Sequence, residues 1–439
     1  MPASPEDLRP LLDQVLAALA AGARDRGGPL PAGGPAAVAF ADLEILPATG
    51  IDGALGDLTR RVAATTADPA DPRCAGHLHC PPLAVAVAAE LVAAALNPSL
   101  DSWDQGPSAT ALEPLVLEAL RQLVFGTRVG AGVMTTGGTE SNLMGLLLAR
   151  EAGIRRVLCS TAAHFSVRRN AHLLGLDASA VVTVPVDAQQ RMIPAELAGA
   201  LVPSPLVVAT AGTTDFGAVD PLPAIVGLCR AAGARLHVDA SYGGGALFSD
   251  RLSGLLDGIA EADTVALDLH KLGWQPIAAG VFLTRDPAGL DPLAERAAYL
   301  NPADDEDAGY PSLLGNSLRT TRRFDAFKVL VTLRTLGREG LGVLVDACHA
   351  LASHAASRIA GSPLLELAAA PVLTSVVFRV RGADNGAIRR RLLHAGTAVV
   401  GRTELDGEVW LKLTLLNPDA TPADVDALLD VVVGAASGG

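Results

Sequence analysis

Lys271 stands in the segment TVALDLHKLGWQP (264–276), where an apolar run ends in a His-Lys pair. A lysine amine attacks aldehydes once partial burial lowers its pKa, so a lysine at a strand end suits imine chemistry. A second apolar run ends at Asp239, 32 residues before Lys271, in the segment LHVDASYGG. An electron-sink cofactor with a pyridine ring needs a lysine for its aldehyde and an acid for its ring nitrogen. The two segments together indicate such a cofactor, whereas a lone His-Lys pair is more often an ordinary strand end.

Four further segments carry residues that suit such a site. In MTTGGTESN (134–142), Gly137 and Gly138 stand between an apolar run and a helical stretch, where backbone N–H groups and the helix dipole favour a phosphate. Such turns are common and are not specific alone. His164 could stack on a planar ring, although a lone histidine is more often a structural hydrogen-bonding residue. The other two segments are ATAGTTDFGAVDP (209–221), with adjacent threonines, and SLRTTRRFDAFK (317–328), a basic cluster that opens a helical region.

Short apolar runs alternate with helical stretches through the middle of the chain. They are found at 132–135, 156–160, 180–184, 206–209, 235–238, 264–267 and 280–283. Helices are predicted at 84–95, 111–125 and 140–152. This alternation predicts an α/β fold with a mainly parallel sheet covered on both faces. Because ligands in such sheets bind beyond the carboxyl ends of the strands, we expect the site at that edge.

Three domains are predicted. Residues 1–70 form an N-terminal helical segment that packs on another surface, 71–344 a large domain and 345–439 a small α+β domain. A long helical region, 325–360, breaks near its glycines and links the last two. The acidic stretch NPADDEDAGY (301–310) is expected to be an exposed, mobile loop. Within the small domain we predict a strand at 373–380, a helix at 387–394, a hairpin of 398–404 and 408–415 around Asp406-Gly407, and a helix at 422–433.

Composition narrows the classes of function. The 439 residues are 50% hydrophobic and 18% charged, which is typical of a large folded core. A net charge of −13 without a basic stripe argues against nucleic acid and anionic membranes as partners. The five cysteines are scattered and lack metal-knuckle spacing, which favours a reducing cytosol and no metal site. The N-terminus has no basic leader, and the longest apolar run is interrupted by Glu90, so we expect a cytoplasmic protein without a membrane span.

Taken in order, these segments resemble the group II pyridoxal-phosphate-dependent amino acid decarboxylases, which are fold-type I enzymes. The resemblance extends from about 71 to 418 and is closest to the bacterial L-2,4-diaminobutyrate decarboxylase-like branch. Its motifs are HLHCPP (77–82), LNPSLDSWDQ (96–105), LDLHK (267–271), TTRRFDAFK (320–328) and KLTLLNP (412–418). It implies α-decarboxylation of an L-amino acid to an amine and CO₂, with pyridoxal 5′-phosphate as cofactor, in a homodimer with active sites at the interface.

The resemblance also implies roles for individual residues. Lys271 would bind the cofactor aldehyde, Asp239 would keep the pyridine nitrogen protonated and His164 would stack on the ring. Tyr310, in the acidic stretch, would be the acid that returns a proton to the substrate carbon. The remaining cofactor-binding residues would be Gly137, Gly138 and Thr139 at the phosphate, Thr214 near the phenolic oxygen, Ser241 beneath the ring, His270 beside the lysine, and Ser317 from the partner subunit.

Two positions depart from the family pattern. Ser241 replaces the usual alanine and adds a hydroxyl near the cofactor. Asp268, three residues before Lys271, would be an unusual neighbour for a phosphate unless it is hydrogen-bonded elsewhere.

By the same resemblance, the substrate side chain would be lined by His77, His79, Asp101 and Trp103. Asp101 would pair with a distal ammonium, as in 2,4-diaminobutyrate, ornithine or lysine. It could equally cap a helix, because it directly precedes Ser102. A second possibility is a carrier-protein-bound or amide-linked amino acid in secondary-metabolite (natural-product) biosynthesis.

The sequence disfavours two other functions. Another fold-type I enzyme, such as an aminotransferase or a β-eliminating lyase, is disfavoured by the His-Lys junction and the spacing between Asp239 and Lys271. A non-catalytic descendant is disfavoured because Lys271, Asp239 and His164 are all intact.

Overall fold

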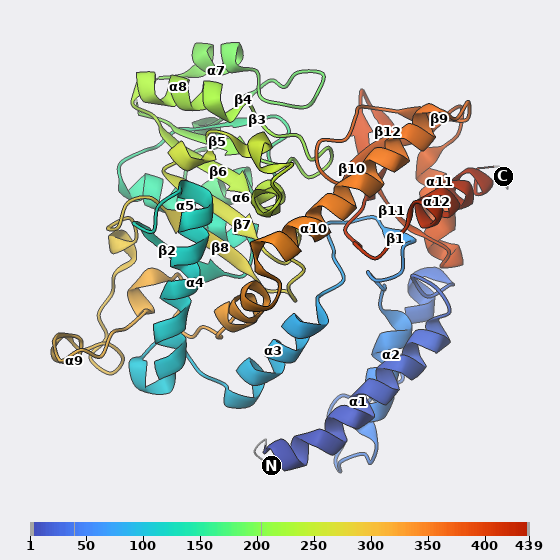
Figure 1. The fold of residues 1–439 in the computed structure, drawn as a ribbon, viewed down its shortest axis with the longest axis horizontal. Helices are drawn as coiled ribbons and strands as arrows, with labels where there is room; N and C mark the ends of the chain where they lie inside the picture. The colour runs from blue at the N-terminus through green and yellow to red at the C-terminus, as the bar shows by residue number, and fades with distance from the viewer. Residues whose placement is uncertain (1–3, 39, 203, 437–439) are drawn as a thin grey trace. The chain divides into compact units, whose positions relative to one another are not determined.

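The computed structural model describes residues 4–38, 40–202 and 204–436. They form two compact units (Figure 1). The large unit consists of residues 82–347, and the small unit combines the described residues up to Pro81 with those from Cys348 onward.

A seven-stranded sheet forms the centre of the large unit. Its strands lie in the order β2 (Ala131–Thr135), β8 (Gly280–Thr284), β7 (Thr264–Asp268), β6 (Arg235–Ala240), β5 (Leu206–Thr210), β3 (Val157–Ser160) and β4 (Val181–Val184). β8 is antiparallel to both of its neighbours, and the pairs from β7 to β4 are parallel. Every predicted apolar run in this region is a strand, so the predicted mainly parallel sheet is confirmed. The central strands are almost completely buried, which explains why their sequences are apolar without alternation.

The large unit also contains helices. They are α3 (Ala84–Leu96), α4 (Pro107–Phe125), α5 (Gly138–Glu151), α6 (Ser166–Leu173), α7 (Pro194–Ala200), α8 (Leu222–Ala232), α9 (Ala303–Asp307) and the first part of α10 (Ala326–Ala360). α5 contacts β2, β6, β7 and β8, whereas α8 contacts β5 and β6. α5 thus covers the strands that precede the predicted lysine and aspartate.

The small unit is built on a second sheet. Its strands lie in the order β1 (Cys74–Ala75), β11 (Val399–Leu405), β12 (Glu408–Thr414), β10 (Ser375–Val380) and β9 (Leu365–Leu367), with helices α11 (Asn385–Ala395) and α12 (Pro422–Gly434). The predicted hairpin is present, and Asp406 (φ 51°) and Gly407 (φ 79°) both have the positive φ that a two-residue turn of this kind requires.

The N-terminal residues belong to this small unit. Helix α1 (Pro5–Arg26) packs on α2 (Ala54–Thr65), and Gly22 allows the approach because a Cβ there would lie 2.4 Å from the carbonyl oxygen of Arg60. The backbone N–H of Gly33 donates to the carbonyl of His394 at 2.7 Å, and β1 pairs with β11. The N-terminal helices therefore share a unit with the C-terminal residues.

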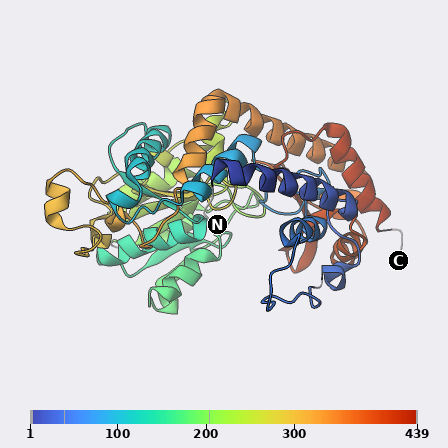
Figure 2. The same cartoon turned by 90° about the horizontal axis from the view of Figure 1, so that it is seen from below.

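The acidic stretch and the long helical region each have a local feature that bears on a prediction from the sequence. The exposed acidic stretch holds the short helix α9 (Figure 2). Glu306 of this helix pairs with Arg296 at 2.7 Å. Both views place α9 at the edge of its unit, apart from the strands. The predicted break in the long helix falls at Gly337, whose φ is 65°. Among the described residues, no helix combines the length and apolar character that crossing a membrane requires.

Candidate active site

The predicted lysine and its companions follow the carboxyl ends of neighbouring parallel strands. Asp239 lies near the end of β6 and Lys271 three residues beyond β7. His164 follows β3, and Thr214 lies in the turn after β5. The topology therefore brings to one edge of the sheet residues that are far apart in the sequence.

Lys271 is held by a buried carboxylate. Its Nζ lies 2.9 Å from Oδ2 of Asp268, whose side chain is only 3% exposed. The Nε2 atom of His270 is 3.5 Å from the same oxygen, and its Nδ1 accepts from the backbone N–H of Ala279. Burial lowers the pKa of His270, and the nearby charge of Asp268 only partly opposes this shift. Asp268 therefore has partners of its own, which accounts for an acid at a position where a phosphate neighbour would be unfavourable.

Asp239 is a fixed, ionised carboxylate. Its Oδ1 accepts from the hydroxyl of Ser241 at 2.6 Å and from that residue's backbone N–H at 3.1 Å. Its Oδ2 accepts from Nδ2 of Asn142 at 2.8 Å. Burial alone would raise the pKa of Asp239, but these hydrogen bonds and the charge of Lys271 outweigh it and hold the pKa below its ordinary value. The departure from alanine at Ser241 thus supplies a hydrogen bond to the acid.

The turn before α5 contains two glycines, and side chains at these positions would crowd neighbouring residues. Gly137 has φ 153°, and a Cβ on Gly138 would lie 2.2 Å from Oγ of Ser241. Thr139 is exposed in the first helical turn. In that turn Glu140 accepts from the backbone N–H of Thr136 at 2.6 Å. The turn therefore has the bare backbone and the helix N-terminus that suit a phosphate.

The basic segment before α10 is anchored rather than free. Arg319 donates to Glu140 at 3.0 Å and to the carbonyl of Met134 at 3.3 Å, which ties this segment to the start of α5. Arg322 forms a buried pair with Glu113 at 2.7 Å. The hydroxyl of Ser317 accepts from the backbone N–H of Arg319.

The adjacent threonines differ in exposure. Thr214 is exposed in its turn, while Thr213 is buried and its hydroxyl accepts from the backbone N–H of Ala218. This arrangement leaves Thr214 as the accessible member of the pair.

Asp101, Trp103 and Tyr310 lie together in the large unit. The Trp103 and Tyr310 rings meet edge to face with centroids 5.0 Å apart, and the hydroxyl of Ser312 donates to the carbonyl of Asp101 at 3.3 Å. The Asp101 side chain is 5% exposed, and within the described parts of the chain its buried Oδ1 has no hydrogen-bond partner. The N-caps that follow are Ser102 and Gly106, so the helix-cap interpretation of Asp101 is wrong.

His77 and His79 belong to the small unit, where both are exposed. Burial, followed by the charges of Lys412 and Arg389, lowers the pKa of His77. His77 therefore lies in cationic surroundings and favours its neutral form.

Two buried residues at the site were missed by the sequence analysis. Asn142 and His237 are both at most 1% exposed, and Nε2 of His237 lies 2.9 Å from Oδ1 of Asn142. Position spacing could have revealed them, because His237 is two residues before Asp239 and so shares its strand face. Asn142 follows Gly138 by four residues on one face of α5.

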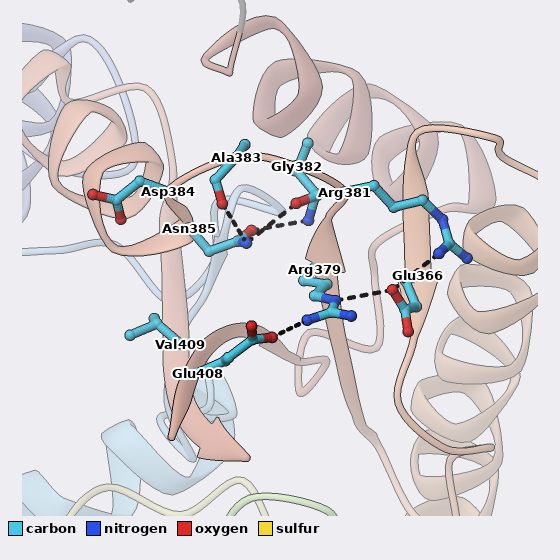
Figure 3. A pocket seen from close by; sticks show the side chains of 10 residues that line it. Glu366, Arg379, Arg381, Gly382, Ala383, Asp384, Asn385, Glu408 and Val409 are labelled. Atoms are coloured by element: carbon cyan, nitrogen blue, oxygen red, sulfur yellow. Dashed lines mark hydrogen bonds and ion pairs between the residues drawn. The ribbon is translucent and has the colours of Figure 1, made fainter. Parts of the chain in front are cut away.

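A second hollow lies in the small unit (Figure 3). It is an open cavity of about 550 Å³ lined by Glu366, Arg379, Val380, Arg381, Gly382, Ala383, Asp384, Asn385, Glu408 and Val409. Glu366 pairs with Arg379 at 2.9 Å and with Arg381 at 3.0 Å, and Asn385 bonds three backbone groups. The arginines of this cavity are thus paired with its glutamates, which leaves them less available to a charged ligand.

The comparison with known families decides between the interpretations of the site. The conserved domain of pyridoxal-dependent decarboxylases matches residues 47–381. The chain belongs to the pyridoxal-dependent decarboxylase family. It is a pyridoxal-phosphate-dependent amino acid decarboxylase, as the sequence motifs predict.

The matches to individual relatives span most of this decarboxylase and most of each relative. An L-2,4-diaminobutyrate decarboxylase of Rhizobium meliloti (strain 1021) is 44% identical over 418 residues, which cover 89% of this chain and 83% of the relative. An L-2,4-diaminobutyrate decarboxylase of Acinetobacter baumannii is 37% identical, and the match covers 83% of this chain and 80% of the relative. The crystal structure of the glutamate decarboxylase domain of diaminobutyrate-pyruvate transaminase and L-2,4-diaminobutyrate decarboxylase from Vibrio parahaemolyticus has a TM-score of 0.86 at 31% identity. It covers 100% of this chain and 98% of that one. The fold is therefore that of the fold-type I enzymes.

The residues of this decarboxylase fit pyridoxal phosphate. A cofactor with a phosphate and a ring nitrogen needs a bare backbone turn, a lysine and an ionised acid. A side chain at Gly138 would collide with Ser241, Asp239 is ionised, and Lys271 is partly exposed beside Asp268.

Proposed function

We propose that this decarboxylase acts on a small diamino acid, with 2,4-diaminobutyrate as the first candidate. The observation that carries the proposal is the buried Oδ1 of Asp101, which lacks a partner in the described residues. A substrate ammonium would supply the missing donor, whereas the carboxylate of glutamate would be repelled. The names of the two bacterial relatives support the same substrate class.

The chemistry divides between the cofactor and the chain. When bound, pyridoxal phosphate supplies an aldehyde for amines and a ring that takes up the electron pair left by departing CO₂. Lys271 would hold the aldehyde and give it up to the amine of the substrate, and Asp239 would place a negative charge at the ring nitrogen. Burial lowers the pKa of His164, so a neutral imidazole would stack on the ring and add no second positive charge.

The phosphate is assigned to the turn before α5. Gly137, Gly138 and Thr139 offer it backbone N–H groups, and Ser317 of the partner subunit adds a hydroxyl. Thr214 lies near the phenolic oxygen and His270 helps to orient Lys271. The exposure of Thr139 and Thr214, and the position of Gly137 and Gly138 between β2 and α5, support these assignments.

A homodimer with sites at its interface is part of this proposal. Large apolar side chains are exposed on three helices, which a monomer rarely leaves in contact with water. They are Leu11, Leu16 and Leu19 on α1, Leu55, Leu58 and Val62 on α2, and Val87, Leu91, Val92 and Leu96 on α3. In that dimer, Asp101, Trp103 and Tyr310 serve the site together, with Tyr310 returning the proton to the substrate carbon, and His77 and His79 complete the substrate pocket. A monomer at micromolar concentration in size measurements would refute the dimer.

The compartment is assigned to the cytoplasm. Cys159, Cys229 and Cys348 are buried thiols, and burial raises the pKa of Cys159 to about 11. Such thiols behave as core residues, as a reducing compartment allows.

The decisive experiment is CO₂ release from a panel of free amino acids by the cofactor-loaded enzyme. The panel contains 2,4-diaminobutyrate, ornithine, lysine, glutamate and aromatic amino acids. Preference for a diamino acid is expected, and preference for glutamate would refute the substrate. If every free amino acid fails although the cofactor band is normal, the substrate is linked to a carrier. Lys271→Ala serves as the control and should abolish release while the protein stays folded.

A further inference from the structure

One buried hydrogen-bond chain leads away from the acid of the site and is not explained by binding the cofactor. It runs from Asp239 through Asn142 to His237 and ends at Thr264, whose hydroxyl lies 2.9 Å from Nδ1 of His237. The side chains of Asn142, His237 and Asp239 are at least 95% buried, so water competes little for these bonds.

Complementarity sets the direction of each bond. Ionised Asp239 only accepts, so the atom of Asn142 that faces it must be the NH₂ group. The carbonyl of Asn142 then faces His237, which must donate from Nε2. Burial lowers the pKa of His237 to about 4, so the ring is neutral and its Nδ1 accepts from the Thr264 hydroxyl. Thr264 and His237 thereby fix one tautomer and one amide orientation.

The second N–H of the amide is also used. Nδ2 of Asn142 lies 3.0 Å from Oγ of Ser166, which lies 2.8 Å from Nδ1 of His164. The backbone N–H of Ser166 also donates to that Nδ1 at 3.3 Å. Rotating the amide would therefore cost two good bonds and place an oxygen against Asp239.

We propose that Asn142 is a positioning residue that, oriented by His237, keeps Asp239 ionised and aimed at the cofactor ring nitrogen. The inference rests on the proposed role of Asp239. Ser241 serves the other oxygen of the same carboxylate, so each oxygen has a donor of its own and the acid has no freedom to take up the ring proton.

The test uses the ring-nitrogen resonance of bound ¹⁵N-labelled pyridoxal phosphate. In the wild type it should report a protonated ring at neutral pH. Asn142→Leu should move it toward the unprotonated position and lower kcat roughly ten- to hundredfold, which is the range for losing a bond to a charged group. Asn385→Leu removes another buried asparagine, in the small unit, and should leave the resonance in place.

The His237 variants keep the test decisive if Asn142→Leu fails to fold. Gln at 237 can still donate to the Asn142 carbonyl, whereas Leu cannot. His237→Gln should therefore keep the wild-type resonance and His237→Leu should shift it. Equal behaviour of the two would overturn the inference.

Two further measurements separate the possible failures. In the cofactor-free enzyme, imidazole ¹⁵N spectra should show His237 neutral with its proton on Nε2, and a proton on Nδ1 would overturn the chain of bonds. If Asp239→Asn shifts the ring resonance while Asn142→Leu does not, the inference fails alone. If neither shifts it, the role of Asp239 fails as well.

Discussion

Asp239 and Asp101 are two carboxyls with the same exposure and opposite surroundings. Each is 5% exposed, in the large unit. Asp239 accepts three hydrogen bonds, from Ser241 and Asn142, whereas the Oδ1 of Asp101 accepts none from the described residues. A buried polar group without a partner costs free energy, so it persists only where something repays it. The difference separates an acid whose charge is held by internal hydrogen bonds from an acid whose Oδ1 has no donor among the described residues, which we propose the substrate supplies.

The largest expected effect comes from Asp239→Asn, which removes the permanent charge. Turnover should fall about a thousandfold, or roughly 4 kcal/mol in the barrier, because the ring nitrogen loses the partner that keeps it protonated. Cofactor affinity should change much less, since the phosphate and Lys271 still bind. CO₂ release and a cofactor titration by absorbance measure the two. Turnover equal to wild type would mean that another group faces the ring nitrogen.

Asp101→Asn should lower kcat/KM for the diamino acid by about a hundredfold, because the ammonium loses a charged partner worth roughly 2–3 kcal/mol. The cofactor-free variant should unfold at the same denaturant concentration as wild type or a higher one, since no internal bond is lost. Asp239→Asn should do the opposite and unfold earlier. A destabilised Asp101→Asn protein would remove the contrast between the two acids.

His237 makes the free energy of unfolding sensitive to acid. Its pKa is about 4 in the folded chain against an ordinary 6.5, so the unfolded chain takes up the proton first as pH falls. The stability due to its neutral ring is fully present above about pH 6.5 and is lost toward pH 4, which amounts to about 3 kcal/mol. Asp220, whose pKa burial raises to about 6, acts in the opposite sense. Unfolding free energies of wild type and His237→Gln at several pH values isolate the histidine. Parallel curves would show that folding leaves the pKa of His237 unchanged, contrary to a buried neutral ring.

Ser241→Ala should have the smallest effect. Asp239 keeps the bond from Asn142 and the backbone N–H at 241, so kcat should fall only about tenfold, the lower end of the range for losing one hydrogen bond to a charged group. The absorbance of the bound cofactor against pH checks whether the ring proton is held less firmly. A loss as large as that of Asp239→Asn would show that Ser241 contacts the reacting groups directly.

The residues grouped around Asp239 were largely predictable from the sequence. Lys271, Asp239 and His164 follow apolar runs, and parallel strands bring their carboxyl ends together. Asn142 and His237 were missed because each is an ordinary buried polar residue until its partner is known. The pairing of Lys271 with Asp268 depends on the turn after β7, which strand periodicity does not describe. Asp101 was assigned two possible roles, and only the observed caps at Ser102 and Gly106 removed one. Short α9 lacks the apolar spacing by which helices are recognised.

Gly138 has a consequence for transplanting this site. Its missing side chain lets the start of α5 approach Ser241 so closely that a Cβ would lie 2.2 Å from that hydroxyl. Asn142 lies four residues later on the same face, about 6 Å further along the axis. The glycine therefore sets how near the amide comes to Asp239, as well as leaving room for a phosphate. Grafting only the glycine turn onto another scaffold would transfer the proposed phosphate-binding turn without Asn142, which donates to Asp239. The smallest graft that carries both features includes α5 and β6.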